Sequence, residues 1–94
     1  MSGQAAERRE VYYSGRVQGV GFRYTVRNLA ARFRVTGFVK NLPDGGVQLV
    51  AEGPPEEIEK LLSAVRQALG RYIVEAEETT GEAAGRFRGF DIRF

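Results

Sequence analysis

The spacing of apolar residues changes along the chain, and each change predicts a new element of secondary structure. Residues 10–17, EVYYSGRV, place Val11 and Tyr13 on one face and are rich in strand-forming side chains, so they predict a strand. Residues 22–34, FRYTVRNLAARFR, then carry apolar side chains at helical spacing, which predicts an amphipathic helix. The apolar positions of this helix are Phe22, Val26, Leu29, Ala30 and Phe33.

The middle of the chain predicts a hairpin and a second helix. Residues 36–42, TGFVKNL, and residues 46–53, GVQLVAEG, flank PDGG, in which proline is placed to open a turn and glycine to close it. Residues 54–69 begin with prolines and acids, as helix starts do, and Gly70 follows at the position of a C-terminal cap. The apolar stripe of this helix consists of Ile58, Leu61, Leu62, Val65 and Leu69.

The remaining residues complete an alternating order of strands and helices. We expect a strand over residues 71–79, a loop around residues 81–86 and a last strand over residues 87–94. In the last strand the residues on one face are Phe90, Ile92 and Phe94. Two helices with one apolar face each must pack on one face of a sheet. The sequence therefore predicts an α+β, ferredoxin-like (split βαβ) fold, with two helices on one face of a mainly antiparallel sheet of four to five strands.

Length and composition are those of one small globular domain. The chain has 94 residues, of which 43% are hydrophobic and 28% charged, and it contains no internal repeat or linker. We expect residues 1–8 to form a flexible tail and residues 9–94 to form a single domain. No apolar stretch reaches the length of a membrane span, and the first residues lack the apolar core of a signal peptide, so we expect a soluble, cytoplasmic protein that binds no membrane.

Two residue types that often carry chemistry are missing. The chain contains no cysteine and no histidine, so it has no thiolate nucleophile, no disulfide and no imidazole to move protons near neutral pH. Its two aspartates, Asp44 and Asp91, lie too far apart to suggest a local metal-binding run. We therefore expect neither a metal nor a cofactor. The net charge of +2 is too small to imply a nucleic-acid partner by itself.

The glycine-rich segment GRVQGVG, residues 15–21, lies between the first predicted strand and the first predicted helix. Glycines let the backbone approach a ligand closely, and amides at a helix N-terminus lack intrahelical partners, so this segment could cradle an anion. Arg23 then places a cation in the first helical turn, where the helix dipole opposes it by about 0.3–1 kcal/mol unless an anion binds in front. The spacing fits neither the dinucleotide fingerprint nor the nucleotide P-loop.

A simpler interpretation explains the same residues. A tight strand-to-helix turn followed by a solvated basic face would also contain these glycines and a run of arginines. The basic face would consist of Arg27, Arg32 and Arg34. Spacing alone therefore leaves an anion site and an ordinary turn both open.

Two signatures in this chain resemble those of the acylphosphatase family. GRVQGVGFR, residues 15–23, resembles the V-Q-G-V-x-F-R loop of that family, and GFVKNLPDGGVQLVAEG, residues 37–53, resembles its second pattern. The matching positions of the second pattern are Gly37, Phe38, Val39, Lys40, Asn41, Gly45, Val47 and Gly53. The similarity extends from about the first strand to the end of the chain, and family members have the ferredoxin-like fold.

The resemblance implies a role for each matching site residue. Arg23 would be the cation that binds phosphate, and Asn41, at the end of the second strand, would position the attacking water. Backbone amides of the loop would form the cradle, at Val17, Gln18, Gly19, Val20, Gly21 and Phe22. Asparagine before a turn is otherwise ordinary loop chemistry, and Lys40 and Asp44 are expected to be exposed strand and turn residues.

This chain departs from the family pattern after the second helix. Family members often have a longer, proline-containing connection there, whereas this chain has only QALGRY, residues 67–72. The sequence consequently leaves the edge of the pocket, in the segment of residues 70–86, undetermined.

The implied substrate explains why histidine and cysteine are dispensable. An acyl phosphate is a mixed anhydride, and cleaving its P–O bond releases a carboxylate, whose conjugate acid has a pKa of about 4. Such a group leaves without a general acid, whereas an alkoxide would need one or a metal. We therefore predict metal-independent hydrolysis of a small-molecule acyl phosphate to a carboxylate and inorganic phosphate by a monomer.

Two other functions are compatible with the same order of elements. RNA-recognition modules share it, but they stack bases on aromatic side chains of the central strands, and no such basic and aromatic stripe is found here. A non-catalytic domain of the same fold would bind an acyl or carbamoyl phosphate, or a partner protein, without turnover.

Overall fold

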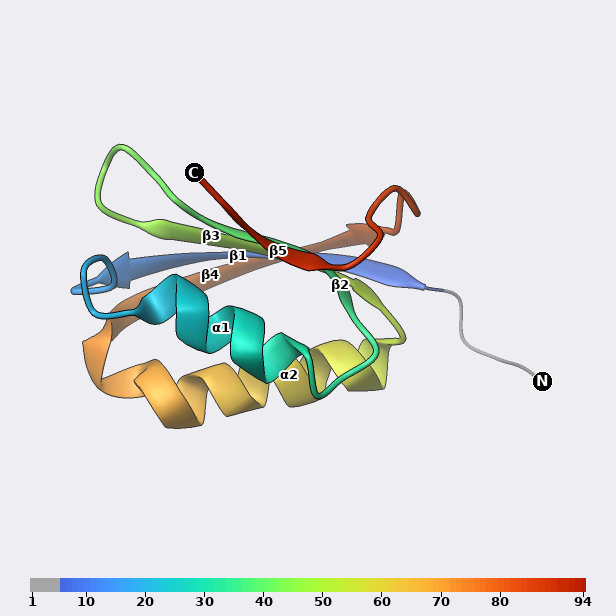
Figure 1. The fold of residues 1–94 in the computed structure, drawn as a ribbon, viewed down its shortest axis with the longest axis horizontal. Coiled ribbons are helices and arrows are strands. Elements are labelled where there is room, and N and C mark those ends of the chain that lie inside the picture. Colours follow the sequence, from blue (N-terminus) through green and yellow to red (C-terminus); the bar gives the residue numbers. More distant parts are fainter. Residues whose placement is uncertain (1–5) are drawn as a thin grey trace.

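Figure 1 shows the computed structural model, which describes residues 6–94: two helices cover one face of a single sheet. The sheet has five strands in the order β4-β1-β3-β2-β5, and every neighbouring pair is antiparallel except β2 and β5, which are parallel. The elements are β1 (Glu7–Gly15), α1 (Phe22–Ala30), β2 (Thr36–Asn41), β3 (Val47–Gly53), α2 (Pro55–Leu69), β4 (Ile73–Glu82) and β5 (Phe90–Arg93). This arrangement confirms the predicted α+β, ferredoxin-like fold.

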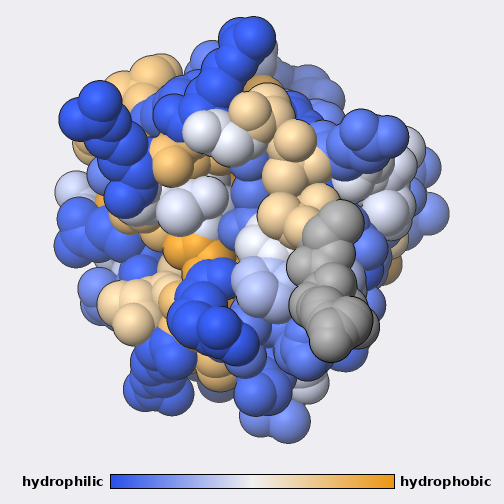
Figure 2. All heavy atoms as spheres, turned by 90° about the vertical axis from the view of Figure 1, so that its right-hand side faces the viewer, coloured by the Kyte–Doolittle hydropathy of each residue, from blue (hydrophilic) through white to orange (hydrophobic). Residues whose placement is uncertain are grey.

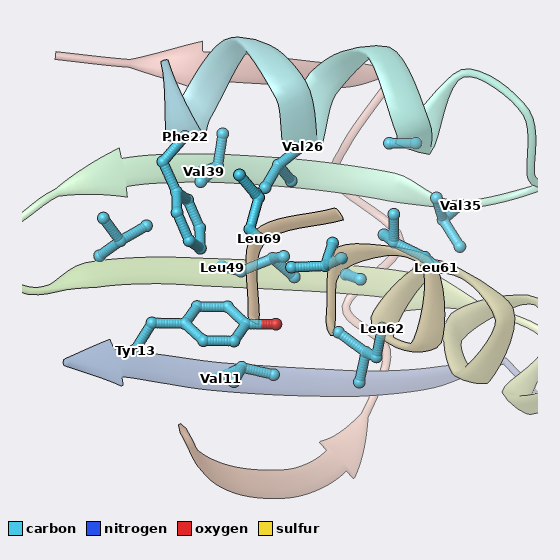
Figure 3. Close-up of a cluster of buried hydrophobic side chains, with 14 of the residues drawn as sticks. Val11, Tyr13, Phe22, Val26, Val35, Val39, Leu49, Leu61, Leu62 and Leu69 are labelled. Atoms are coloured by element: carbon cyan, nitrogen blue, oxygen red, sulfur yellow. The ribbon is translucent and has the colours of Figure 1, made fainter. Parts of the chain in front are cut away.

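The core lies between the sheet and the two helices. Alternate residues of β1 and β3 point toward the helices, and the apolar stripes of α1 and α2 point back, as Figure 3 shows. The rings of Tyr13 and Phe22 meet in a tilted pair with centroids 5.3 Å apart, which packs the start of α1 against β1. The fully buried residues with the largest side chains include Phe22, Leu49, Ile58, Leu61, Val11, Val17 and Val26. The helix that follows the glycine loop is therefore anchored at its first residue.

Helix α1 is shorter than the apolar spacing predicts, because it ends at Ala30 instead of residue 34. The chain leaves the helix through tighter turns, in which the amides of Arg32 and Phe33 donate to carbonyls three residues earlier. The next amide, of Arg34, donates instead to the carboxylate of Glu57 on α2, at 2.9 Å. The backbone has therefore left the α-helical path before Arg34, and a carboxylate from a distant part of the chain accepts its amide.

The first strand begins earlier and ends earlier than the predicted residues 10–17. Glu7 and Arg8 pair with Gly53 and Glu52 of β3, so the expectation of a flexible tail over residues 1–8 is wrong for these two residues. Residues 1–5 of that expected tail lie outside the described part of the chain. The sequence does not predict this end of the strand, because residues 7–10 are all charged and show no alternation of apolar and polar side chains.

The last third of the chain also differs in its boundaries. Gly70 is right-handed (φ −57°) and begins a 3₁₀ turn, Gly70–Tyr72, so β4 starts at Ile73 and runs to Glu82, past the predicted end at residue 79. β5 is shorter than the predicted residues 87–94. Phe87 instead packs on the outer face of the sheet against Phe38, with ring centroids 5.8 Å apart.

The two ends of the sheet differ in what they present. The β1–α1 loop and the tip of the β2–β3 hairpin lie at one end of the molecule in Figure 1. The opposite end, which faces the viewer in Figure 2, is mainly hydrophilic, with small groups of apolar side chains between the hydrophilic ones. Within residues 6–94, no helix is both long enough and apolar enough to cross a membrane.

Candidate active site

A cavity of about 280 Å³ opens between the β1–α1 loop and the end of β2. It is lined by Val17, Gly19, Gly21, Phe22, Arg23, Tyr24 and Asn41. The fold thus brings Arg23 and Asn41 to one cavity, although one follows the glycine loop and the other ends a strand. Of the expected loop residues, Gln18 and Val20 do not line it, and the side chain of Val20 is exposed.

The loop adopts a backbone that requires glycine at two of these positions. Gly19 and Gly21 have φ of +81° and +75°, in the left-handed region that residues with a Cβ atom seldom adopt. A Cβ at either position would meet no atom within 4 Å, so the backbone conformation, and not crowding, imposes glycine there. Both glycines border the cavity with bare backbone.

Gly21 is also the N-cap of α1, and it provides no side chain to cap the first amides. The first turn contains no acidic residue, so nothing in the helix itself neutralises the positive end of its dipole. Backbone amides without intrahelical partners therefore lie beside the cavity. In other proteins, such amides at a helix N-terminus bind phosphate.

Arg23 is partly exposed and carries its charge without an acidic partner among residues 6–94. Its Nη1 donates to the carbonyl of Arg93 at 3.3 Å, and its guanidinium lies 4.8 Å from the centroid of the Phe94 ring. These two contacts orient the side chain while leaving most of its five N–H donors unused. A bound anion could take those donors.

Asn41 ends β2, opposite Val47 of β3, at the start of the hairpin turn. The turn is closed by the amide of Leu42, which donates to the carbonyl of Gly46 at 2.8 Å. Asp44 braces it from outside: its carboxylate accepts from the Tyr12 hydroxyl and from the Gly46 amide. The hydroxyl of Tyr12, and next the Gly46 amide, lower the pKa of Asp44, and the same carboxylate raises the pKa of Tyr12.

The positions expected to be ordinary strand and turn residues are placed as such. Lys40 lies within β2 but is half-buried, unlike the exposed side chain that was expected, whereas Asp44 is exposed in the turn. Asp44 nevertheless braces the turn through Tyr12, a contact across the sheet that local sequence does not reveal. Tyr24 was not expected at the site but lines the cavity, with the Arg27 guanidinium 5.3 Å from its ring centroid.

The segment of residues 70–86 does not border this cavity. Gly70, Ile73, Ala76 and Glu78 line a separate cavity of about 190 Å³, between α2 and β4. The short connection after α2 therefore shapes a different part of the surface and leaves the lining around Arg23 and Asn41 to the loop, α1 and β2.

The lining of the cavity around Arg23 offers donors and no carboxylate. A guanidinium, a carboxamide and helix-terminal amides suit an anion such as a phosphoryl group. Among residues 6–94 there is no group of three or more His, Cys, Asp or Glu side chains placed to hold a metal ion. The site is thus equipped to bind and orient an anion, with arginine as its strongest donor.

Fold and site together define an α+β domain in which a glycine-rich strand-to-helix loop, Arg23 and Asn41 line one cavity. The sequence model of the acylphosphatase family matches residues 9–92, which is nearly the whole described chain. An acylphosphatase of Salinibacter ruber is 46% identical over 81 residues, covering 85% of each chain, and one of Archaeoglobus fulgidus is 39% identical, covering 90% of this chain and 96% of that one. The crystal structure of acylphosphatase from Bacillus subtilis superposes with a TM-score of 0.86 at 31% identity, covering 94% and 99%. The chain belongs to the acylphosphatase family.

Proposed function

We propose that this protein hydrolyses acyl phosphates to a carboxylate and inorganic phosphate without a metal ion, with the phosphoryl group held by the β1–α1 loop and Arg23. Family membership and curated relatives that carry the name acylphosphatase support the reaction itself. The observation that carries the mechanism is the meeting of Arg23, Asn41 and an uncapped helix N-terminus in one cavity.

The phosphoryl group binds where its charge is best compensated. Its equatorial oxygens accept from the loop amides and from Arg23, whose fork-shaped donor set can engage two oxygens at once. Charge on these oxygens is redistributed as the P–O bond to the acyl group breaks, and donors fixed in place stabilise that redistribution without rearranging. Arg23 therefore acts on both binding and rate.

The side-chain amide of Asn41 orients water in line with the leaving oxygen. The water oxygen forms a new bond to phosphorus, the bond between phosphorus and the acyl oxygen breaks with its electron pair, and the carboxylate departs. A non-bridging phosphate oxygen accepts the proton of the water, so the products are carboxylate and protonated inorganic phosphate. No residue of the chain is required to change its protonation state.

The function is tested by measuring carboxylate release from benzoyl phosphate in excess chelator, with p-nitrophenyl phosphate as a second substrate. We expect turnover of the anhydride alone, resistant to chelator and lost in Arg23→Ala. Arg32→Ala is the matched control, because it removes the same charge from an exposed position just beyond α1. Phosphate binding without turnover by the folded protein would contradict the enzymatic role and favour a binding domain.

A further inference from the structure

The two proposed catalytic side chains reach the cavity from different elements. Their relative positions therefore depend on contacts that join those elements. Arg23 belongs to α1, which follows the β1–α1 loop, and Asn41 belongs to the β2–β3 hairpin. A water held by Asn41 attacks productively only if it lies in line with a phosphoryl group that the loop holds. An error of about 1 Å in such an alignment can reduce a rate by about 10².

Gln18 provides a direct link between the loop and the hairpin. Its side-chain Nε2 donates to the carbonyl of Leu42 and to the carbonyl of Gly46, each at 2.8 Å. These carbonyls belong to the two ends of the hairpin turn, and Leu42 directly follows Asn41. One amide group thus uses both of its N–H donors on the two sides of the turn.

Within residues 6–94, these two bonds are the hydrogen bonds that join the loop of residues 16–21 to the turn of residues 42–46. The Tyr12 hydroxyl also reaches the turn, at Asp44, but it comes from β1 and braces the outer side. The backbone of the loop is tied elsewhere, by the amide of Arg16 to the carbonyl of Tyr72 at 2.8 Å. Gln18 is therefore the contact that couples the phosphate cradle to Asn41.

We propose that the side chain of Gln18 is a positioning residue that sets Asn41 relative to the phosphoryl group bound in the loop. This inference rests on the proposed function, because it assigns Gln18 a part in the same reaction. Gln18 does not line the cavity, so it acts through Asn41 and does not touch the phosphoryl group with its side chain. Its backbone amide keeps the separate, expected place in the cradle.

The chemistry of the contact requires a carboxamide with this reach. Leucine has a similar size but no donor, and glutamate would turn acceptor oxygens toward two carbonyls and add negative charge beside a phosphate site. Because Gln18 is exposed, water can replace its two bonds, and the Gly46 carbonyl keeps its bond from the Leu42 amide. We therefore expect Gln18→Leu to affect catalysis far more than folding.

The decisive experiment measures kcat, KM for benzoyl phosphate and inhibition by inorganic phosphate in Gln18→Leu. Gln67→Leu, on the exposed side of α2, is the matched control. We expect kcat to fall about tenfold, with KM and phosphate inhibition changed by less than about twofold and the unfolding midpoint unchanged. In the Asn41→Ala background, Gln18→Leu should have almost no further effect on kcat.

Other outcomes would overturn the inference. An unchanged kcat would remove the positioning role, and a raised KM with normal kcat would mean that Gln18 shapes the phosphate cradle alone. Full additivity with Asn41→Ala would show that Gln18 acts independently of Asn41.

A readout without turnover separates this inference from the proposed function. With inorganic phosphate bound, Gln18→Leu should shift the NMR resonances of the Asn41 side-chain amide and of the backbone amides around Leu42, whereas Gln67→Leu should not. If the native protein binds phosphate but turns over no acyl phosphate, the proposed function fails while these shifts still show the coupling. Unmoved resonances in Gln18→Leu would overturn the coupling itself.

Discussion

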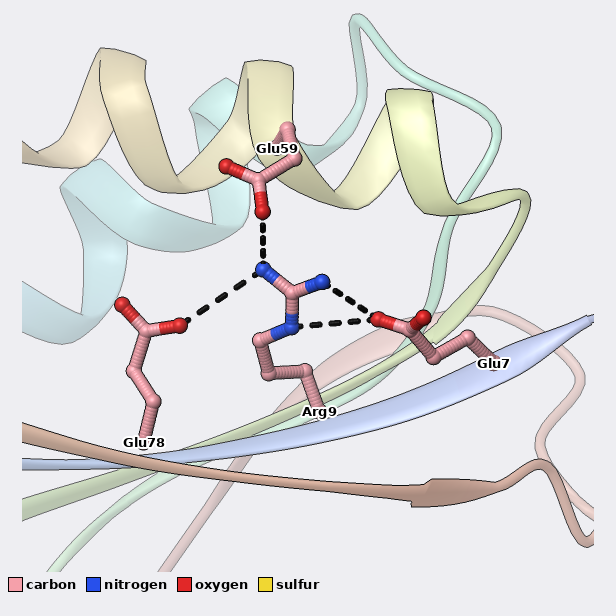
Figure 4. Close-up of polar contacts among 4 residues, drawn as sticks. All are labelled: Glu7, Arg9, Glu59 and Glu78. Carbon is pink, nitrogen blue, oxygen red and sulfur yellow. Dashed lines mark hydrogen bonds and ion pairs between the residues drawn. The ribbon is translucent and has the colours of Figure 1, made fainter.

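Arg9 and Arg23 carry the same charged group into opposite surroundings. Arg9, on β1, is only 9% exposed, and three glutamates surround it: it donates to Glu7 and Glu59 and lies 3.5 Å from an oxygen of Glu78 (Figure 4). The bond to Glu59, and next the bond to Glu7, raise the pKa of Arg9 against the effect of its burial. Arg23 has a backbone carbonyl and an aromatic ring as its contacts and no carboxylate in the described chain.

The difference separates a structural arginine from one that is available to a ligand. Glu59 belongs to α2 and Glu78 to β4, the strand beside β1 in the sheet. Arg9 therefore links β1 to α2 and β4 through contacts that occupy its donors. An incoming phosphate would have to displace carboxylates and would be repelled by them. At Arg23 most of the donors are unused within the described chain, and the nearby helix N-terminus adds positive potential, so an anion placed there would be attracted.

The largest effect should follow removal of Arg23. We expect Arg23→Ala to lower kcat/KM for benzoyl phosphate by about 10²–10³, because a fixed charged donor to the reacting group is lost. Its free energy of unfolding should change little, since no acidic side chain among residues 6–94 pairs with this arginine. Steady-state kinetics together with urea denaturation check both parts, and an intact rate would contradict the role of Arg23.

The next prediction concerns Asn41, whose removal should affect turnover more than binding. Asn41→Ala should lower kcat by about tenfold to a hundredfold while KM and inhibition by inorganic phosphate change little, because its partner is the water and not the phosphoryl group. The same kinetic series measures this split. A variant with full turnover would remove Asn41 from the mechanism.

Arg9 should show the reverse behaviour. We expect Arg9→Ala to lower the free energy of unfolding by about 1–3 kcal/mol, because it leaves three glutamates facing one another where β1 meets α2. The loss stays moderate because Glu59 and Glu78 are partly solvated, so water screens their repulsion. Urea denaturation measures the loss, and kcat/KM of the folded variant should match the native value. A large kinetic defect in the folded fraction would break the contrast with Arg23.

The smallest effect concerns Asp44, which braces the hairpin near the site. The Tyr12 hydroxyl lowers the pKa of Asp44 in the folded state, so this carboxylate stabilises the fold above its unfolded pKa of about 3.9, and the contribution is lost as the pH falls through the lowered folded value. Asp44→Asn should therefore flatten the decline of stability between about pH 5 and pH 2. Unfolding curves at several pH values test this, and Tyr12→Phe should have an overlapping effect.

The elements were predictable where one face of an element is apolar, as in α2 and the β2–β3 hairpin. The end of α1 was not, because Phe33 keeps helical spacing although the chain has already turned more tightly after Ala30. The amide of Arg34 then donates to Glu57, which lies far along the chain. The start of β1 was missed for a similar reason. Its charged residues lack the apolar pattern of a strand. Arg9 is buried there because glutamates that are distant in the sequence pair with it.

For the candidate site, the sequence motifs singled out Arg23, Asn41 and the glycine loop, and in the structure they line one cavity. The arrangement that distinguishes Arg23 from Arg9 depends on partners that are remote in sequence, so no local pattern could supply it. The same holds for Gln18, whose side chain donates to two carbonyls of a hairpin that lies further along the sequence. Motifs can indicate which residues meet a ligand, whereas the contacts that hold those residues in place depend on the fold.

One paired measurement tests the contrast most directly: kcat/KM for benzoyl phosphate in excess chelator and the free energy of unfolding, for Arg23→Ala and Arg9→Ala side by side. We predict that Arg23→Ala loses activity and keeps its stability, while Arg9→Ala loses stability and keeps its activity when folded. If Arg23→Ala retained native kcat/KM, or if both variants lost activity to the same extent while folded, Arg23 would not be the arginine that holds the phosphoryl group.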